Sequence, residues 1–483
     1  MSSPSPLLYA RVADDLVRAI QTGVYREGDR LPSIRSQSKR LSVSASTILE
    51  AYAQLQDRGL VESRPQSGFY VRRTARAPDP PPMSRPRLAP TEVSMGAIAM
   101  EVVRATADPA LVAFGTALPD MNLPGPKSVR RLLASVARSH GTRALAYEVP
   151  PGNRELRVQI ARRAALAGCA FGPDDVVVTS GCQEALLLCL RAISSPGDTI
   201  AVESPTFYGT LQAIRSLGLR ALEIPTHPET GISLESLEMA LEQFPIKGLV
   251  VTPHASNPLG YVMPDSRKAD LLHLAQAHGV PLIEDDVHGE LVYGAGRPRA
   301  IKAWDTRDDV LLCSSVSKSI APGLRVGWAV PGRFLEAVNT LKLVTNMASA
   351  TLPQLVVAEY LSQGHGGFDR HLRAARVSYA SARDRLVELV GKHFPKETRV
   401  SRPAGGFVAW LELPKSTDSV ALYRRALAEG ISIAPGPLFS AREKYKHFVR
   451  INFAQGWDGK AIAAFATLGR LAASGRRGGE RDE

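Results

Sequence analysis

The sequence of 483 residues lacks most features that mark membrane, secreted and metal-binding proteins. It has no apolar run of about eighteen residues, which a membrane-spanning helix would need. Its opening, MSSPSPLLYARVADD, lacks the basic start and apolar core of a secretory signal. Its four cysteines show no C-x-x-C spacing, so neither a zinc site nor a disulfide framework is indicated. We therefore expect a reduced, cytoplasmic protein with no metal site and no membrane partner.

The charge balance of the chain is basic. Lys and Arg total 59 residues against 47 Asp and Glu, which gives a formal net charge of +12. Such an excess favours a polyanionic partner, although many enzymes are equally basic. Apolar residues make up 44% and charged residues 22%, a globular balance that excludes disorder throughout the chain. The length argues for more than one domain.

Composition changes abruptly between residues 74 and 90, where TARAPDPPPMSRPRLAP contains six prolines and no apolar periodicity. Proline prevents helix continuation and favours extended chain, so this stretch predicts a semi-rigid linker. We place the linker at 74–105, between a first domain over 1–73 and a second domain over 106–472. The tail, SGRRGGERDE, predicts disorder over 473–483.

The first domain has the pattern helix, short helix, turn, helix and hairpin. Apolar residues recur every four positions from Leu8 to Ile20, which indicates one amphipathic helix. Pro32 suits the first turn of a short second helix, and Ser44 is a plausible N-cap for a third helix running to Arg58. Two short strands, LVES and GFYVR, follow. This order predicts an α+β winged helix-turn-helix domain.

The second domain alternates between short strands and helices. The apolar runs VVVTS, TIAVES, GLVVTP, PLIEDD and VLLCSS are continuous and β-branched, which is typical of strands buried on both faces of a parallel sheet. Helical segments such as EALLLCLRAI lie between them, so the fold class is α/β. In open α/β sheets, ligands bind beyond the carboxyl ends of the strands. The unusual residues of this sequence gather at those ends.

Three strand ends carry chemically distinctive residues. The turn 180–183 has small residues where a helix begins, which suits a phosphate or simply a tight turn. The acids 284–286 end a strand, where one carboxylate can hold a protonated pyridine nitrogen; mutual repulsion predicts that they are hydrated. Lys318 follows a buried strand, where desolvation lowers the pKa of an amine and favours imine formation, and Arg325 offers donors to a phosphate. Together these groups match the needs of pyridoxal phosphate.

The region from about residue 105 to residue 470 resembles the fold-type I pyridoxal-phosphate enzymes of the aspartate aminotransferase class. The matching motifs are AYEVPPGNRELR, TSGCQEAL, VESPTFYG, HASNPLG, IEDDVHGEL, SSVSKSIAPGLRVGW and FVRINFA. The resemblance implies that Lys318 forms the internal aldimine, Asp285 pairs with the ring nitrogen and Asn257 bonds the ring hydroxyl. It also implies that Phe207 stacks on the ring and that Arg450 binds the α-carboxylate of an amino acid.

The same resemblance assigns ligands to the cofactor phosphate. The sequence departs from the family pattern at two positions. His288 stands where a tyrosine usually donates to the ring hydroxyl; imidazole can donate too, but it titrates near neutrality. A cysteine stands in the phosphate turn where a hydroxyl or small side chain is common, so a strong side-chain donor is lost there. The implied phosphate ligands are Gly181, Cys182, Ser315, Ser317 and Arg325, with Tyr147 reaching the phosphate of the partner subunit.

The first region resembles a GntR-type winged helix in REGDRLPSIR, in the S-x-S-T start of the third helix and in RPQSGFYVR. Residues 1–76 contain twelve Lys and Arg against seven acids, as binding to a phosphate backbone requires. Ala45 stands where many relatives carry an arginine, so it can only contact a thymine methyl or make room. The implied DNA contacts are Arg35 on phosphate or a base edge, Ser44, Ser46 and Thr47 in the major groove, and Arg64 and Gln66 in the wing.

A GntR-type winged helix, a proline-rich linker and an aminotransferase-like domain in this order resemble the MocR group of transcription regulators. The resemblance implies a homodimer, often head to tail, that binds double-stranded promoter DNA and senses an amino acid or related amine by aldimine exchange at Lys318. One alternative is a catalytically active aminotransferase with an accessory DNA-binding domain. Another is that the cofactor itself is the effector. The residues alone do not separate these possibilities.

Overall fold

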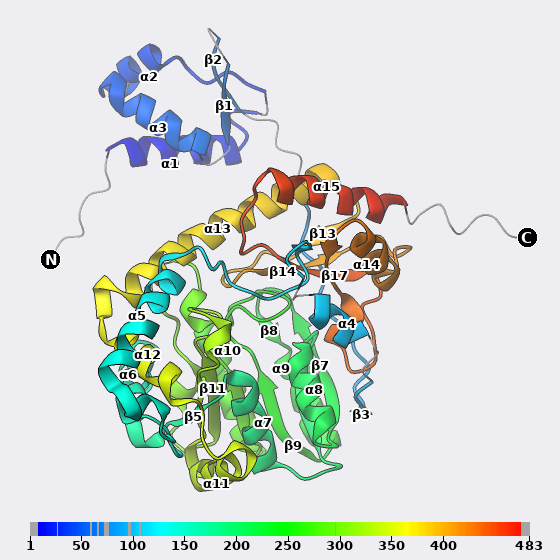
Figure 1. Ribbon diagram of the computed structural model, residues 1–483. Helices are drawn as coiled ribbons and strands as arrows, with labels where there is room; N and C mark the ends of the chain where they lie inside the picture. Colours follow the sequence, from blue (N-terminus) through cyan, green and yellow to red (C-terminus); the bar gives the residue numbers. More distant parts are fainter. Residues whose placement is uncertain are drawn as a thin grey trace, which may run out of the picture. The chain divides into compact units, whose positions relative to one another are not determined.

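The computed structural model describes residues 8–474 except 27, 58–59, 65–66, 72–76, 95–97, 106–107 and 295. The chain divides into two compact units, residues 1–77 and 78–483 (Figure 1). The predicted tail lies outside the described residues from 475 onwards, and its first two residues belong to the last helix. No helix in the described part of the chain has both the length and the apolar character needed to cross a bilayer.

The first unit consists of three helices followed by an antiparallel hairpin, which confirms the predicted winged helix-turn-helix. Apolar side chains of all three helices and both strands form its core, and buried Tyr52 donates to the carbonyl oxygen of Pro32 at 2.7 Å. The Ser44 hydroxyl accepts from the backbone N–H of Thr47 at 3.1 Å, as expected for an N-cap. The elements are α1 (Leu8–Gln21), α2 (Ile34–Leu41), α3 (Ala45–Asp57), β1 (Val61–Arg64) and β2 (Gly68–Val71).

The second unit is built around one large sheet, and this sheet is mixed. Strands β7, β6, β9, β10 and β11 are parallel, whereas β12 runs antiparallel to both of its neighbours and β3 runs antiparallel to β7. The spatial order is β3 (Thr91–Glu92), β7 (Arg220–His227), β6 (Thr199–Ser204), β9 (Ile246–Val251), β10 (Leu282–Asp285), β11 (Val310–Ser315), β12 (Gly327–Val330) and β5 (Val177–Thr179).

The five apolar runs named from the sequence form strands that run in one direction, as predicted, and β12, which was not predicted, runs the opposite way between β11 and β5. A short connection joins β11 to β12, whereas a parallel pair needs a long crossover, usually through a helix. The reversal has a consequence for the site. Gly327, which begins β12, pairs with Ser315 of β11 and with Thr179 of β5, so Arg325 arrives at the edge where the parallel strands end.

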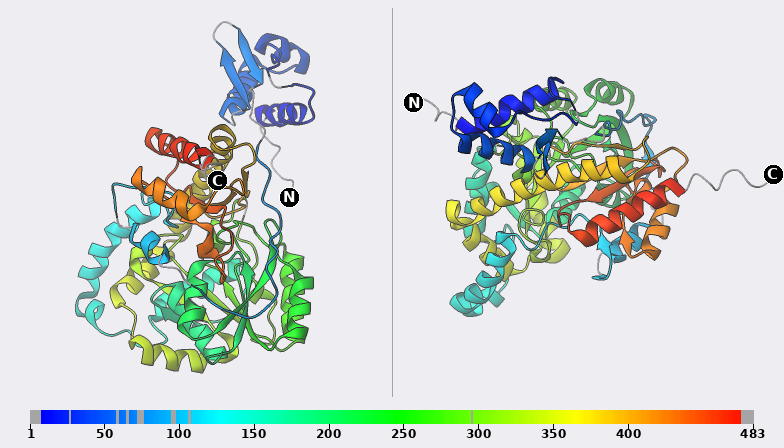
Figure 2. Two further views of the ribbon diagram at one scale, coloured as in Figure 1. Left: turned by 90° about the vertical axis from the view of Figure 1, so that its right-hand side faces the viewer. Right: turned by 90° about the horizontal axis from the view of Figure 1, so that it is seen from above.

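The continuous apolar runs reflect burial of the sheet on both faces. Ile200, Val202 and Ile283 point into one core, and the intervening Ala201 and Leu282 point into the other. One face is covered by α7 (Cys182–Ile193), α8 (Tyr208–Ser216) and α11 (Leu335–Asn346). The opposite face is covered by α6 (Arg154–Leu166), α9 (Leu234–Gln243), α10 (Asp265–Ala277) and α12 (Thr351–Ser362) (Figure 2).

A smaller sheet with its own helices completes the second unit. Its strands are β13 (Arg399–Val400), β14 (Val408–Glu412), β17 (Phe448–Asn452) and β16 (Ala434–Pro435). Trp410 of β14 lies opposite Arg450 of β17. The other elements are α4 (Ile98–Ala105), α5 (Pro124–His140), α13 (Phe368–His393), α14 (Ser419–Ala428) and α15 (Gly459–Ser474), with the short pairs β4 (Val112–Ala113) to β15 (Ile431–Ser432) and β8 (Gly231–Ile232) to β7.

Only part of the predicted linker over 74–105 lies between the units. From residue 78 onwards the chain belongs to the second unit (Figure 2). The carbonyl oxygen of Asp79 accepts from Val400 N–H at 3.0 Å, and the Ser84 hydroxyl accepts from Thr226 N–H at 2.8 Å. β3 then pairs with the edge of the large sheet. These are mostly backbone contacts of an extended chain, which need no apolar periodicity and so leave little trace in the sequence.

Candidate functional site

A cavity of about 170 Å³ lies at the carboxyl edge of the large sheet. Most of the site residues predicted in the second unit line it, although they come from five separate stretches of the chain. Sequence reasoning missed four lining residues, Gln183, Leu186, Thr252 and Val287, each a close neighbour of a motif residue. The predicted residues that line the cavity are Cys182, Phe207, Asn257, Asp285, His288, Ser315, Ser317, Lys318 and Arg325.

One end of the cavity is built to receive an anion. Gly181 has φ +88° and stands at the N-cap of α7, so a helix N-terminus points at this end. The guanidinium of Arg325 packs against the α-carbon of Gly181, where any β-carbon would collide with it. Arg325 Nη2 donates to the carbonyl oxygen of Ser180 at 2.8 Å. Together with the hydroxyls of Ser315 and Ser317, this end carries the donors that a phosphate needs.

Asp285 supplies the carboxylate of the cavity, and it is buried. Its Oδ1 accepts from Val287 N–H at 3.2 Å, and the Cys182 thiol donates to the same oxygen at 3.5 Å. Burial raises the pKa of Asp285 from 3.8 to about 6, so the carboxylate is ionised at neutral pH and suits a cationic ring nitrogen. The Cys182 side chain therefore contacts the acid, and only its backbone N–H remains for a phosphate.

The two acids beside Asp285 are also buried, so the expectation of a hydrated cluster is wrong. Glu284 accepts from the backbone N–H groups of Ile301 at 2.8 Å and Lys302 at 2.9 Å, and burial raises its pKa to about 7. Burial opposes ionisation of Asp286 too, but Arg297 and His254 lower its pKa to about 2. Alternate residues of a strand point to opposite sides, so Asp285 points away from the other two acids. Glu284 and Asp286 share a side, and repulsion from Asp286 adds to burial in raising the pKa of Glu284.

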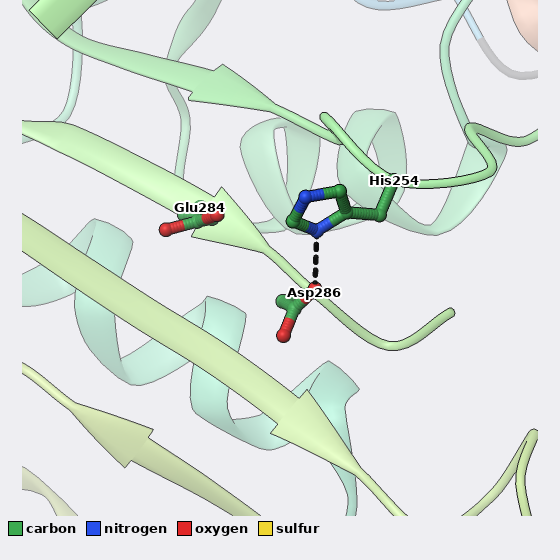
Figure 3. A group of neighbouring side chains, drawn as sticks. All are labelled: His254, Glu284 and Asp286. Carbon is green, nitrogen blue, oxygen red and sulfur yellow. Dashed lines mark hydrogen bonds and ion pairs between the residues drawn. The ribbon is translucent and has the colours of Figure 1, made fainter. Parts of the chain in front are cut away.

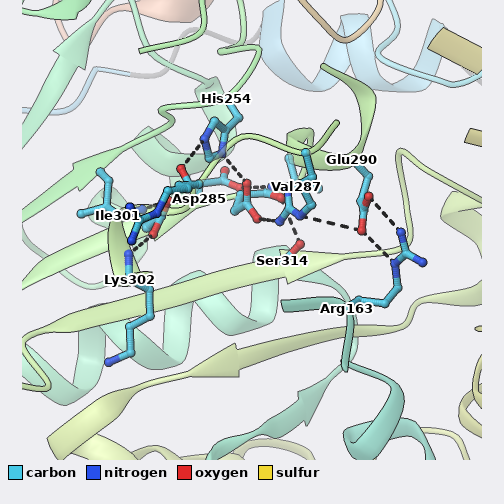
Figure 4. A network of polar contacts seen from close by, with 12 residues as sticks. Arg163, His254, Asp285, Val287, Glu290, Ile301, Lys302 and Ser314 are labelled. Atoms are coloured by element: carbon cyan, nitrogen blue, oxygen red, sulfur yellow. Dashed lines mark hydrogen bonds and ion pairs between the residues drawn. The ribbon is translucent and has the colours of Figure 1, made fainter. Parts of the chain in front are cut away.

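His254, Glu284 and Asp286 lie close enough to suggest a metal centre, but their ligand atoms are already engaged (Figure 3). His254 Nδ1 bonds Asp286 at 2.7 Å, and its Nε2 bonds the carbonyl oxygen of Arg299 at 3.1 Å. The network continues from Asp286 through Arg297 to Glu290 and Arg163 (Figure 4). We read this network as the support that holds the end of β10, and hence Asp285, in place.

Lys318 lies in the turn that follows β11 and lines the cavity. Its Nζ donates to the carbonyl oxygen of Ala117 at 2.6 Å. Burial, together with the nearby guanidinium of Arg450, lowers the pKa of the amine from 10.5 to about 8. A larger fraction of the amine is then unprotonated near neutrality than for an ordinary lysine, which is the form that attacks an aldehyde. The sequence-based expectation of a desolvated amine agrees with this position.

Arg450 is fully buried on β17 beside the cavity. Its Nη2 donates to the carbonyl oxygen of Gly115, whereas Nε and Nη1 have no hydrogen-bond partner among the residues that the structure describes. Burial lowers the pKa of Arg450 to about 10, so the group stays charged at neutral pH. A buried cation with unpaired donors is costly unless a ligand anion completes it. A carboxylate is the natural complement of the two free donors.

His288 and Asn257 contribute further unpaired polar atoms. His288 is buried, and within the described part of the chain neither ring nitrogen has a hydrogen-bond partner. Burial and the neighbouring Lys318 lower its pKa to about 3, so the imidazole is neutral and the expectation that it titrates near neutrality is wrong. The Oδ1 atom of Asn257 is likewise unpaired among the described groups. Phe207 immediately precedes α8 and brings an aromatic ring to the same cavity.

Tyr147 lies outside the cavity. Its side chain is 79% exposed, on a stretch whose neighbours Leu145 and Val149 are exposed as well. Its predicted role at the phosphate of a partner subunit stays a prediction. The other cavity groups fit pyridoxal phosphate: donors at one end, a buried carboxylate, an enclosed amine, and unpaired buried atoms on Asn257 and His288.

In the first unit the predicted DNA-contacting residues lie at the surface. Arg35 on α2 is exposed, as are Ser44 and Ser46. The Ser44 hydroxyl bonds the hydroxyls of Ser46 at 2.8 Å and Thr47 at 2.7 Å. Arg64 pairs with Glu62 and stacks over Tyr70, and Gln66 lies outside the described residues. The exposed Lys39 and Arg40 in the last turn of α2 were missed, although the run SKRL marks them in the sequence.

Family models match both units. The model for aminotransferases of class I and II matches residues 119–464, and the model for bacterial regulatory proteins of the gntR family matches residues 8–71. The chain is 41% identical over 446 residues to "Uncharacterized HTH-type transcriptional regulator YjiR" of Escherichia coli, which covers 92% of this chain and 94% of that protein. It is 30% identical to the 2-aminoadipate transaminase of Thermus thermophilus, over 73% of this chain and 88% of that enzyme.

The fold of the second unit has close counterparts among solved structures. The α-aminoadipate aminotransferase LysN of Thermus thermophilus, solved with N-(5'-phosphopyridoxyl)-L-leucine, matches with a TM-score of 0.72 and 28% identity, over 80% of this chain and 96% of that one. The relatives that match nearly the full length of this chain are named transcriptional regulators. The chain therefore belongs to the MocR-type transcriptional regulators, in which a GntR-type DNA-binding domain precedes a class I and II aminotransferase-like domain.

Proposed function

We propose that this regulator holds pyridoxal phosphate in the cavity and responds to an amino acid or related amine, whose carboxylate binds Arg450. The observation that carries the proposal is the buried Arg450, which has two donor atoms without a partner among the described residues, beside the enclosed amine of Lys318. When bound, the cofactor supplies an aldehyde that reacts reversibly with amines. The Arg325 end of the cavity would hold its phosphate, and Asp285 would hold its ring nitrogen.

The roles of this chain's own residues follow from their surroundings. Lys318 gives up its hydrogen bond to Ala117 when it reacts and can return to that carbonyl oxygen when an effector amine replaces it. His288 stays neutral, so it can exchange one hydrogen bond with the cofactor or effector without adding charge. Arg450 orients the effector and gains from it the partners that it lacks. The ligand stabilises the state in which this pairing is made.

A continuous set of contacts connects the cavity to the anchored segment after the linker. Phe207 follows Ser204, whose hydroxyl bonds the Tyr445 hydroxyl at 2.7 Å. Ser84 also bonds Tyr445, and it bonds Thr226 through two hydrogen bonds. Tyr445 lies three residues before β17, the strand that carries Arg450, and its carbonyl oxygen accepts from Phe448 N–H at 2.9 Å. Both the ring-stacking side and the carboxylate side of the cavity thus connect to the segment that leads toward the DNA-binding unit.

We further propose a homodimer, head to tail, that works on promoter DNA in the cytoplasm. Two DNA-binding units on one dimer would contact two half-sites. The exposed apolar side chains of Leu145, Tyr147 and Val149 support a self-association surface at this stretch. A second candidate function is transamination, since enzymes such as the 2-aminoadipate transaminase are similar to this chain and Lys318, Asp285 and Arg450 are all present.

The test is an absorption spectrum of the purified protein, titrated with a panel of amino acids, alongside DNA binding at one fixed salt concentration. We expect a visible cofactor band that shifts with particular ligands and a parallel change in promoter affinity. The Lys318→Ala variant should lose the band and the ligand response while keeping its fold. Retained absorbance with an unchanged ligand response in that variant would contradict the proposal.

The same titration separates the alternatives. Conversion of the cofactor to its amine form, with turnover on a keto acid and only salt-sensitive, non-specific DNA binding, would establish the enzyme instead. A promoter affinity that changes when pyridoxal phosphate is added to cofactor-free protein, with no further effect of any amino acid, would establish the cofactor as the effector.

A further inference from the structure

His371 lies outside the cavity and hydrogen-bonds to two other segments, the loop that carries Lys318 and the start of α5. It belongs to α13 and is 2% exposed. Its Nδ1 accepts from the backbone N–H of Gly125 at 3.1 Å, and its Nε2 bonds the carbonyl oxygen of Ser319 at 2.6 Å. Ser319 follows Lys318 directly, and Gly125 lies in the first turn of α5. One side chain of α13 therefore connects the lysine loop to the start of another helix.

The two partners fix the chemical form of the imidazole. Because Ser319 offers only an acceptor, Nε2 must carry the proton; because Gly125 offers only a donor, Nδ1 must be bare. Burial lowers the pKa of His371, in agreement with a neutral ring. The ring packs directly on Gly125, where a β-carbon would lie only 2.6 Å from it, so only glycine fits there. His371 is thus a fixed, singly protonated bridge.

The lysine loop needs such a support. Residues 316–320 form a turn, where Ile320 N–H donates to the carbonyl oxygen of Val316 at 2.8 Å, so neither a helix nor a strand sets the direction of the Lys318 side chain. The Lys318 amine contacts Ala117, in the stretch that precedes α5. A second residue of α13 contacts that stretch, because the hydroxyl of Tyr379 accepts from Asp120 N–H at 3.1 Å. α13 therefore holds both the lysine loop and the stretch that its amine contacts.

We propose that His371 is a positioning residue for Lys318: its Nε2–H bond to the Ser319 carbonyl orients the turn so that the amine projects toward the cavity. This role depends on the proposed function, because an oriented Lys318 amine matters only if it captures an aldehyde cofactor. The orientation of the amine itself can be measured without any cofactor, so failure of one proposal is distinguishable from failure of the other.

Two variants of His371 separate its two hydrogen bonds. The amide nitrogen of His371→Gln takes the place of Nε2–H and keeps the donor to Ser319. The amide oxygen of His371→Asn takes the place of Nδ1 and keeps only the acceptor for Gly125. Tyr379→Phe is the matched control on the same helix, because it removes the contact to Asp120 and leaves the lysine loop untouched.

The first readout is acetylation of Lys318 in cofactor-free protein with acetic anhydride over a range of pH, followed by peptide mass spectrometry. The second is the rate at which each protein captures added pyridoxal phosphate. We expect His371→Asn to slow capture about tenfold, the size of effect that one buried hydrogen bond produces, and to shift the pH profile of acetylation. His371→Gln and Tyr379→Phe should stay within about twofold of the parent protein in both assays.

Equal behaviour of the Gln and Asn variants, with both folded by thermal melting, would overturn the proposal. Should the Asn variant fail to fold, the Gln variant still decides, because loss of fast capture in His371→Gln would also overturn it. A shifted acetylation profile in His371→Asn alone, combined with a parent protein whose promoter affinity responds to no ligand, would instead point to a failure of the proposed function alone.

Discussion

The two units differ in the solvent exposure of their predicted functional residues. In the DNA-binding unit, Arg35, Ser44 and Ser46 are exposed, and Arg64 is paired with Glu62 and Tyr70 on its own surface. In the second unit, Arg450 and His288 are buried and have polar atoms that find no partner in the described part of the chain. Exposed groups are hydrated and cost the fold little, whereas buried unpaired groups destabilise it by about 1–3 kcal/mol each. The second arrangement is therefore the stronger indication of a ligand.

We expect the largest effect from Arg450→Met, which tests whether the unpaired buried groups of the second unit bind a ligand. Loss of the charged pair with a carboxylate should weaken amino-acid binding by about a hundredfold or more. Because the variant removes a buried cation with unpaired donors, the ligand-free protein should at the same time become more stable, by about 1 kcal/mol in free energy of unfolding. Titration calorimetry and thermal melting of the same samples check both halves. A ligand-free variant that melts below the parent would refute the stability half.

The pH dependence of cofactor capture tests the enclosed amine. The unprotonated form of Lys318 reacts, so the rate should rise about tenfold per pH unit and level off above a pH of about 8. The pKa of Lys318 is lower folded than unfolded, so the unfolded chain binds the extra proton between about 8 and 10.5 and stability should rise with pH across that window. Lys318→Ala should lose this increment, and an unchanged rise would contradict the assignment.

The paired arginine of the wing offers the corresponding test in the first unit. Glu62→Gln removes the carboxylate that competes with phosphate for Arg64, so DNA affinity at low salt should rise severalfold. Arg64→Ala should weaken binding and reduce the salt slope by about one. Fluorescence anisotropy at several salt concentrations measures both. Equal salt slopes for Arg64→Ala and the parent protein would exclude a phosphate contact.

The anchored segment should give the smallest effect. Ser84→Ala removes the side-chain bond to Thr226 and the contact to Tyr445 but keeps the backbone bond to Thr226 and leaves both units folded. We expect unchanged affinity of the second unit for an amino acid, and about a twofold smaller change in promoter affinity upon ligand addition. Thr22→Ala, which removes a surface hydroxyl bond at the end of α1, is the matched control. A full response in Ser84→Ala would exclude this route of transmission.

Local signals predicted local structure well. The four-residue spacing of apolar residues predicted α1, and Ser44 was predicted as the cap that the structure places before α3. The motif residues around Lys318 and Asp285 were also predicted as neighbours, because each follows a parallel strand whose carboxyl end meets the same edge. The reversed strand β12 was not predicted, since the direction of a strand depends on the strands beside it.

By itself the sequence determined the order of the two domains, the elements that build them and the reactive groups of the cavity, because spacing, caps and strand-end residues act over short distances. The protonation states and charge partners of those groups depend on the tertiary structure. Asp285 is enclosed, Asp286 is ionised beside Arg297, and His288 is neutral. Arg450 keeps two donors unpaired among the described residues. In each case the cause is that segments far apart in the chain surround the group. Solvation and charge pairing depend on all neighbours in space, and the position of one residue in the chain does not contain that information.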